Sequence, residues 1–298
     1  MTFAVPLTLG DRRILRPGNW RPARSLAWMV AMIFAIMLAF GLFSDALSHT
    51  WPNEPALRFM VKAAGALIVL CTYVAMVRAG ELRWPDELSL KAAPAGTLIG
   101  LALGAVLFCI VMAVLTGAGL YDFAYHGPAP AWRGAGLALE SAVLEEVLVR
   151  GVVLRLIWRA FGPVTAFVAS AFLFGLGHLA NPGANLLSVA CVGLEAGVML
   201  GSFYALTGRL WMSIGVHAGW NFTQGYVFGA QVSGGDFGSS IATSTARGNM
   251  PVWLTGGNFG PEATLPALLI CTATGAFVIW LGWRAGRFAA APHAGEPE

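Results

Sequence analysis

Long hydrophobic windows alternate with short polar stretches along this chain. A helix needs about 20 apolar residues to cross a bilayer, and eight windows are of roughly that length. The pattern predicts an all-α fold, a polytopic membrane helix bundle of about eight transmembrane helices. The windows cover 26–43, 59–77, 95–120, 134–158, 163–180, 184–207, 210–230 and 263–283.

Composition supports a membrane environment. Hydrophobic residues make up 57% of the chain and charged residues 11%, and the mean hydropathy is +0.69. These values are typical of an integral membrane protein. The four cysteines all lie in apolar windows without a C-x-x-C pair, which favours a role as small buried residues.

Basic residues predict the orientation of the bundle. If the eight windows alternate across the membrane, 13 of the 18 Lys and Arg residues fall on one side. The excess predicts that both termini are cytoplasmic, and the residue usage favours a bacterial cell (inner) membrane. We expect a basic cytoplasmic N-terminal tail over 1–24, a transmembrane domain over 25–285 and a C-terminal tail over 286–298. The net charge of +3 then reflects topology, and no nucleic acid partner is expected.

The most informative polar residues are the charged ones in the fourth window. Ionisable side chains are costly inside a membrane and mark candidate functional sites. Glu146 and Arg150 are one helical turn apart and can form an ion pair, whereas Glu145 points elsewhere. A pair that only joins two helices explains Glu146 and Arg150. Such a pair does not explain why Glu145 is present, so we interpret Glu145 as a candidate general base.

Two further groups follow in later windows. His178 comes just before the helix-stopping Asn181 and Pro182, and His217 and Asn221 lie one turn apart on one helix face. Two neighbouring donors can stabilise an oxyanion. They can equally form hydrogen bonds between helices, and a single membrane histidine can do the same.

The three groups together resemble a known family. They read "EEVLVR" at 145–150, "FGLGH" at 174–178 and "HAGWN" at 217–221, in this order on separate windows. This combination is similar to the CPBP intramembrane glutamic endopeptidases, which include type II CAAX prenyl endopeptidases and bacteriocin-processing or immunity proteins. The resemblance covers 134–230, which we therefore take as the catalytic core.

The resemblance implies a role for each motif residue. Glu145 and His178 would activate a water molecule, and His217 and Asn221 would stabilise the tetrahedral oxyanion. The ion-paired residues Glu146 and Arg150 would hold the site in shape.

A metal mechanism is an alternative, because one glutamate and two histidines can ligate zinc. No H-E-x-x-H motif is present, and the amide of Asn221 suits hydrogen bonding better than zinc ligation. We therefore expect a metal-independent peptide hydrolase without a cofactor. Its partners would be a peptide or membrane-protein substrate and the lipid bilayer.

Two other functions remain open on the sequence. A proton-coupled transporter would use the same carboxylates as a relay, and an immunity-type membrane partner would need no catalysis. Glu140 and Glu195 are candidates to line the site. The Gly-rich segment 231–262 is either a connector or a lid over it.

Overall fold

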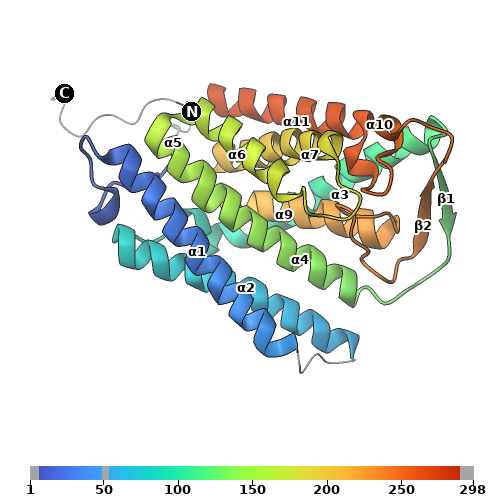
Figure 1. Cartoon of the computed structure of the whole chain (residues 1–298), viewed down its shortest axis with the longest axis horizontal. Helices are drawn as coiled ribbons and strands as arrows, with labels where there is room; N and C mark the ends of the chain where they lie inside the picture. The colour runs from blue at the N-terminus through green and yellow to red at the C-terminus, as the bar shows by residue number, and fades with distance from the viewer. Residues whose placement is uncertain (1–6, 49–53, 289–298) are drawn as a thin grey trace.

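The computed structural model describes residues 7–48 and 54–288. Residues 1–6 of the predicted N-terminal tail and 289–298 of the predicted C-terminal tail lie outside the described residues. The described chain is a helix bundle with one small sheet (Figure 1). The principal helices are α1 (Arg21–Ser48), α2 (Pro55–Glu81), α3 (Ala93–Gly117), α4 (Trp132–Glu146), α5 (Arg155–Phe161), α6 (Pro163–Gly177), α7 (Leu186–Leu194), α8 (Gly201–Thr207), α9 (Leu210–Phe222) and α11 (Leu265–Arg284).

Each of the eight hydrophobic windows coincides with a helical segment, which confirms the all-α polytopic bundle. Within the described residues, five helices are long and apolar enough to cross a membrane, so the count of eight spans stays a prediction. Helix α6 is apolar but shorter. The five helices span Arg21–Leu47, Pro55–Glu81, Asp86–Gly117, Leu186–Thr207 and Leu265–Arg284.

Large apolar side chains face outward from these helices. Phe34 on α1 is 67% exposed, Phe172 on α6 is 68% exposed and Phe277 on α11 is 58% exposed. Such a surface is unfavourable in water and suits contact with lipid. The chain is a multi-pass membrane protein.

Small residues bring α3 and α9 into backbone contact. A Cβ atom added at Gly100 would lie 2.6 Å from the carbonyl oxygen of Met212, and one at Gly215 would lie 2.5 Å from that of Thr97. Gly219 faces the backbone of α3 in the same way. Because helix association in membranes depends on such close packing, this contact fixes the position of α9.

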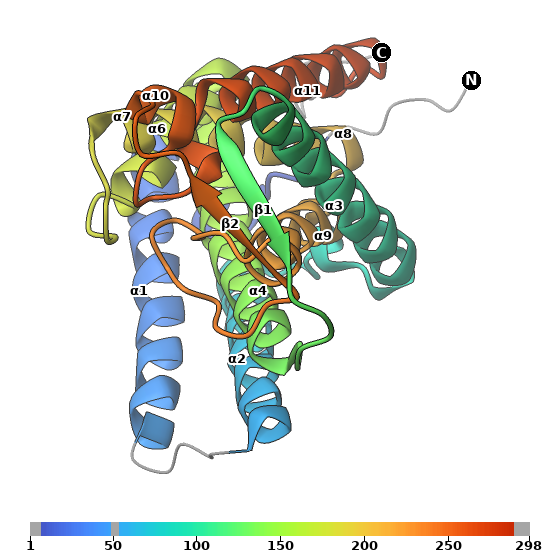
Figure 2. The same cartoon turned by 90° about the vertical axis from the view of Figure 1, so that its right-hand side faces the viewer.

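The sheet was not predicted from the sequence. Strands β1 (Tyr121–Tyr125) and β2 (Ala242–Ala246) pair in antiparallel register, with Tyr121 opposite Ala246. They lie at one end of the bundle (Figures 1 and 2). The segment 231–262 therefore contains a strand, the short helix α10 (Val252–Thr255) and a 3₁₀ turn at Pro261–Ala263.

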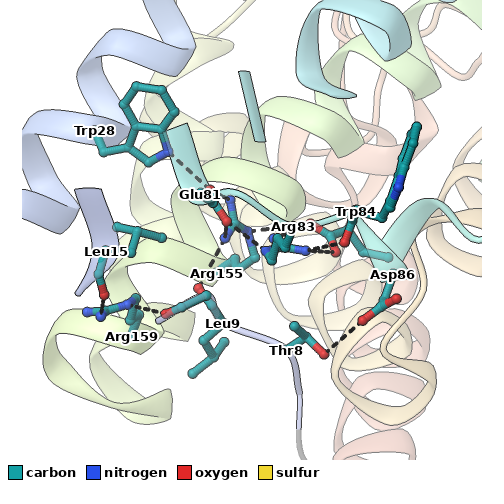
Figure 3. A network of polar contacts seen from close by, with 12 residues as sticks. Thr8, Leu9, Leu15, Trp28, Glu81, Arg83, Trp84, Asp86, Arg155 and Arg159 are labelled. Carbon is teal, nitrogen blue, oxygen red and sulfur yellow. Dashed lines mark hydrogen bonds and ion pairs between the residues drawn. The ribbon is translucent and has the colours of Figure 1, made fainter. Parts of the chain in front are cut away.

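A buried charge network occupies the other end of the bundle (Figure 3). The guanidinium of Arg155 donates two hydrogen bonds to the carboxylate of Glu81, at 2.7 and 2.9 Å, and both side chains are fully buried. Trp28 donates to Glu81 at 3.0 Å, and Arg83 bridges Glu81 and Glu87 at 2.8 Å each. From the sequence, Arg155 was only one of the 13 basic residues that predict the cytoplasmic side. Its partner Glu81 was missed.

The same network holds part of the segment predicted as an N-terminal tail. Arg155 donates to the carbonyl oxygen of Leu9 at 3.1 Å. The guanidinium of Arg159 donates to the carbonyl oxygens of Gly10 and Leu15. These bonds fix residues 9–15 against α5 (Figure 3).

Candidate active site

Within the described residues, three helices of the bundle contain a π-helical turn. One turn spans Val147–Leu154 and joins α4 to α5; another spans Glu195–Leu200 and joins α7 to α8; and the third, Thr223–Val227, extends α9. π-Helical turns are rare and are often found at functional sites. Two of them adjoin the first and third motifs. The remaining one begins at Glu195, which belongs to no motif.

Glu145 lies between the two motif histidines. The distance from its Oε2 atom to Nε2 of His178 is 3.9 Å, and the distance to Nε2 of His217 is also 3.9 Å. These distances are too long for direct hydrogen bonds, so the three groups need a shared ligand to link them. Among the described residues, Oε2 of Glu145 is buried without a hydrogen-bond partner. The three side chains can therefore converge on one small molecule.

The second ring nitrogen of each histidine is held by an acceptor. Nδ1 of His178 lies 2.8 Å from the carbonyl oxygen of Phe174, and Nδ1 of His217 lies 2.9 Å from Oε1 of Glu146. A carbonyl or a carboxylate accepts, so both Nδ1 atoms are protonated. In the neutral rings, each Nε2 atom then presents a lone pair toward Glu145.

Glu146 and Arg150 form the ion pair that their spacing predicts. Nη1 of Arg150 donates to Oε1 of Glu146 at 2.8 Å, and both side chains are fully buried. Nη2 of Arg150 donates to the carbonyl oxygen of Ala196, and the guanidinium lies 5.0 Å from the centre of the Phe174 ring. Arg150 thus joins three helices. The contact of Glu146 with His217 was not predicted.

Asn221 lies one turn beyond His217 and is 7% exposed. Its Nδ2 atom donates to Oγ of Ser141 on α4 at 3.2 Å. The amide has a second N–H, which leaves a donor available to a ligand. His217 and Asn221 therefore lie side by side, as their spacing predicts.

Two cavities meet at these residues. The larger has a volume of about 400 Å³ and lies on the Glu145 side. The smaller has a volume of about 50 Å³ and lies on the Glu195 side. Both cavities are lined by His178, His217, Asn221 and Ser233.

Segment 231–262 covers the site. Val232, Ser233 and Phe237 line the larger cavity, and Ser233 and Glu262 line the smaller one. Sequence reasoning considered this segment as a lid but did not identify Glu262. An acidic residue in a Gly-rich connection carries no periodic signal that distinguishes it from a solvated one.

The two additional membrane glutamates line different cavities. Glu140 lines the larger cavity and forms an ion pair with Lys62 of α2. Glu195 lines the smaller one. Within the described residues, no group of three or more His, Cys, Asp or Glu side chains is arranged to hold a metal ion.

Comparison with known proteins finds a curated relative and a family model. A curated protein of Aeromonas salmonicida (strain A449), named "Putative transport protein", is 28% identical over 164 residues. The alignment covers 53% of this chain but only 28% of that relative, so the chain spans about a quarter of the relative's length. No solved structure matches the chain.

The family model described as "Type II CAAX prenyl endopeptidase Rce1-like" matches residues 127–223. This segment is about a third of the chain and contains all three motifs. The match supports the resemblance of this segment to the CPBP family of intramembrane endopeptidases.

Proposed function

We propose that this protein is an intramembrane glutamic endopeptidase that hydrolyses a peptide bond without a metal ion. The single observation that carries the proposal is the equal spacing of 3.9 Å from Oε2 of Glu145 to Nε2 of His178 and of His217. A water molecule at this point contacts a carboxylate and an imidazole lone pair at once. This is the arrangement that general base catalysis needs.

The first step of the proposed reaction is water attack. The water oxygen forms a bond to the carbonyl carbon, and Glu145, assisted by His178, takes the proton. Electrons of the carbonyl double bond move to its oxygen, which becomes an oxyanion. Asn221 donates an N–H to this oxyanion. His217 donates from Nε2 when its ring carries both protons, and the carboxylate of Glu146 then compensates the imidazolium charge.

Breakdown of the intermediate completes the reaction. The carbon–nitrogen bond breaks, and the proton held by Glu145 passes to the leaving amine. Glu145 is then a carboxylate again, and the products are a carboxylic acid and an amine. Glu146 and Arg150 touch no reacting atom in this scheme, so they act as positioning residues.

The orientation of the site follows from the basic residues. Arg83, Arg155 and Arg159 gather at one end of the bundle, whereas β1, β2 and segment 231–262 lie at the other. With both termini cytoplasmic in a bacterial inner membrane, segment 231–262 and the side of the larger cavity that it covers face the periplasm. The proposed substrates are peptides or membrane proteins that reach the site from that side.

A proton-coupled transporter is the second candidate function, and the similarity to the Aeromonas salmonicida protein named "Putative transport protein" is the observation that favours it. Such a carrier would use Glu145 as part of a proton relay. It should show pH-dependent solute uptake in vesicles. A non-catalytic membrane partner would instead keep its cellular phenotype with Glu145 replaced.

One experiment separates these functions. The membrane proteome of cells that express the wild-type protein is compared with that of cells that express Glu145→Gln. The endopeptidase account expects specific proteins that are shortened only with the wild type. Identical proteomes, together with wild-type solute uptake that Glu145→Gln abolishes, would favour the transporter.

A further inference from the structure

The smaller cavity contains two carboxyl groups that the proposed reaction does not use. It lies beside the catalytic residues and shares His178, His217 and Asn221 with the larger cavity. Glu195 and Glu262 line it together with mainly apolar side chains. The apolar members are Phe174, Val192, Ala196, Met199, Leu200 and Trp220.

Glu195 has an unused acceptor in this cavity. Its side chain is 4% exposed, and among the described residues its Oε1 atom is buried without a hydrogen-bond partner. Glu195 also begins the π-helical turn Glu195–Leu200, in the helix that carries no motif. An orphaned buried acceptor is costly unless a ligand completes it.

Glu262 approaches from segment 231–262 and is 6% exposed. Oγ of Ser233 donates to its Oε1 atom at 2.6 Å, and Gln224 also donates to the carboxyl group. Burial raises the pKa of the Glu262 carboxyl group, against the opposing effect of these hydrogen bonds and of the neighbouring His178 side chain. The carboxyl groups of Glu195 and Glu262 also interact electrostatically.

Two buried acidic groups in an apolar cavity favour a positively charged occupant. Within the described residues, no Lys or Arg forms an ion pair with either Glu195 or Glu262. Burying charge without such compensation is unfavourable, and a cation with N–H donors would satisfy both carboxyl groups. The aromatic ring of Trp220 in the lining adds a surface that favours a cation.

The volume limits the size of that cation. A group the size of a water molecule needs about 10–15 Å³ of cavity volume. The smaller cavity, at about 50 Å³, therefore accepts roughly four non-hydrogen atoms. A primary ammonium group with a short carbon stem fits this limit. It has three N–H donors, which match the acceptors that the two carboxyl groups offer.

We propose that the smaller cavity is a subsite for a primary ammonium group of the peptide substrate, carried by a lysine side chain or by the chain N-terminus. The identity of the ligand as part of a substrate rests on the proposed endopeptidase function. Binding of the ammonium group itself does not. The cavity adjoins the catalytic residues, so the bound group sets which peptide bond lies at Glu145.

The first test uses propylammonium as the probe and needs no substrate. Thermal unfolding of the purified full-length protein in detergent is followed at constant ionic strength. A ligand that binds the folded state raises Tm, so Tm should rise with propylammonium concentration. It should not rise with 1-propanol, which lacks the charge, or with tetramethylammonium, which lacks N–H donors.

Four variants locate the binding site. Glu195→Gln and Glu262→Gln should each require at least about tenfold more propylammonium for the same rise in Tm, because a charged hydrogen-bond partner is lost. Glu145→Gln and Glu140→Gln make the same change in the larger cavity and should keep the wild-type response. The proposal fails if the wild type does not respond, if both small-cavity variants respond like the wild type, or if only Glu145→Gln abolishes the response.

Altered peptides then distinguish a lysine side chain from the chain N-terminus as the source of the ammonium group. A cleaved peptide is compared with a version in which lysine is replaced by norleucine and with a version whose N-terminus is acetylated. If kcat/KM falls about tenfold or more with one of the two altered peptides, the altered group is the source of the ammonium. The fall should be smaller with the Glu262→Gln enzyme. No fall with either peptide overturns the substrate assignment. If the wild type cleaves no peptide while propylammonium still binds, the endopeptidase proposal fails and the ammonium site stands without it.

Discussion

Nδ1 of His217 and Nη1 of Arg150 donate to the same carboxylate oxygen, Oε1 of Glu146, at 2.9 and 2.8 Å. Two adjacent glutamates therefore have different surroundings. The side chain of Glu146 is fully buried and accepts both hydrogen bonds at Oε1, whereas Glu145 lines the larger cavity. Glu146 orients the ring whose opposite nitrogen faces Glu145, so the first and third motifs form one connected unit.

Replacement of Arg150 tests this unit. Arg150→Ala leaves a buried carboxylate uncompensated, and breaking a buried pair typically costs about 3–5 kcal/mol. We expect both Tm and peptide cleavage to fall. Arg247→Ala is the control, because the Arg247–Asp122 pair is exposed and such pairs contribute little. An Arg150→Ala protein with wild-type Tm but no cleavage would indicate that Arg150 contacts substrate instead.

The Glu81–Arg155 pair should act as a single structural unit (Figure 3). Glu81→Ala and Arg155→Ala each leave a charge buried at the end of the bundle opposite the sheet, so each should cost about 3–5 kcal/mol of stability. The double variant should cost clearly less than the sum, because the same interaction is removed twice. Unfolding midpoints of the wild type and the three variants give this coupling. Strictly additive losses would contradict it.

Gly219 tests how α3 positions the site. A Cβ atom there meets the backbone of Leu101, so Gly219→Val should force the helices apart, at about 1–3 kcal/mol for overpacking. Because Gly219 lies between His217 and Asn221, cleavage should fall as well. Gly41→Ala on α1 is the control, since no atom lies within 4 Å of its added Cβ. Equal behaviour of the two variants in Tm and cleavage would show that this helix contact does not position the site.

Asn221 should contribute less than the general base. Asn221→Ala removes one proposed oxyanion donor, and such a donor typically contributes about 2.7–4 kcal/mol to transition-state stabilisation. We expect kcat to fall about 10²–10³-fold with KM little changed. An equal fall in affinity, with kcat preserved, would place Asn221 in substrate binding instead of oxyanion stabilisation.

The helices could be predicted because a bilayer offers few alternatives. Backbone groups in lipid must be paired within the segment, so a long apolar window such as 59–77 becomes a helix. The Glu146–Arg150 pair could also be predicted, because helical geometry brings residues four positions apart together. In both cases the information is local in the sequence.

The contacts that could not be predicted join distant parts of the chain. Glu146 and His217 are separated by 71 positions, and Glu81 and Arg155 by 74. The helix packing decides which of several possible partners each charge meets, and no local pattern encodes it. Glu262 was missed for the same reason, since only the fold of segment 231–262 brings it beside Glu195.

Glu145→Gln tests the central claim most directly. The change keeps the size of the side chain but removes the proton acceptor, so folding should survive while cleavage collapses. The purified wild type and the variant are compared for Tm and for cleavage of the same peptide mixture, with and without a strong chelator. The account predicts equal Tm values, wild-type cleavage that is unaffected by the chelator, and no cleavage by Glu145→Gln. Cleavage by Glu145→Gln at the wild-type rate would contradict it.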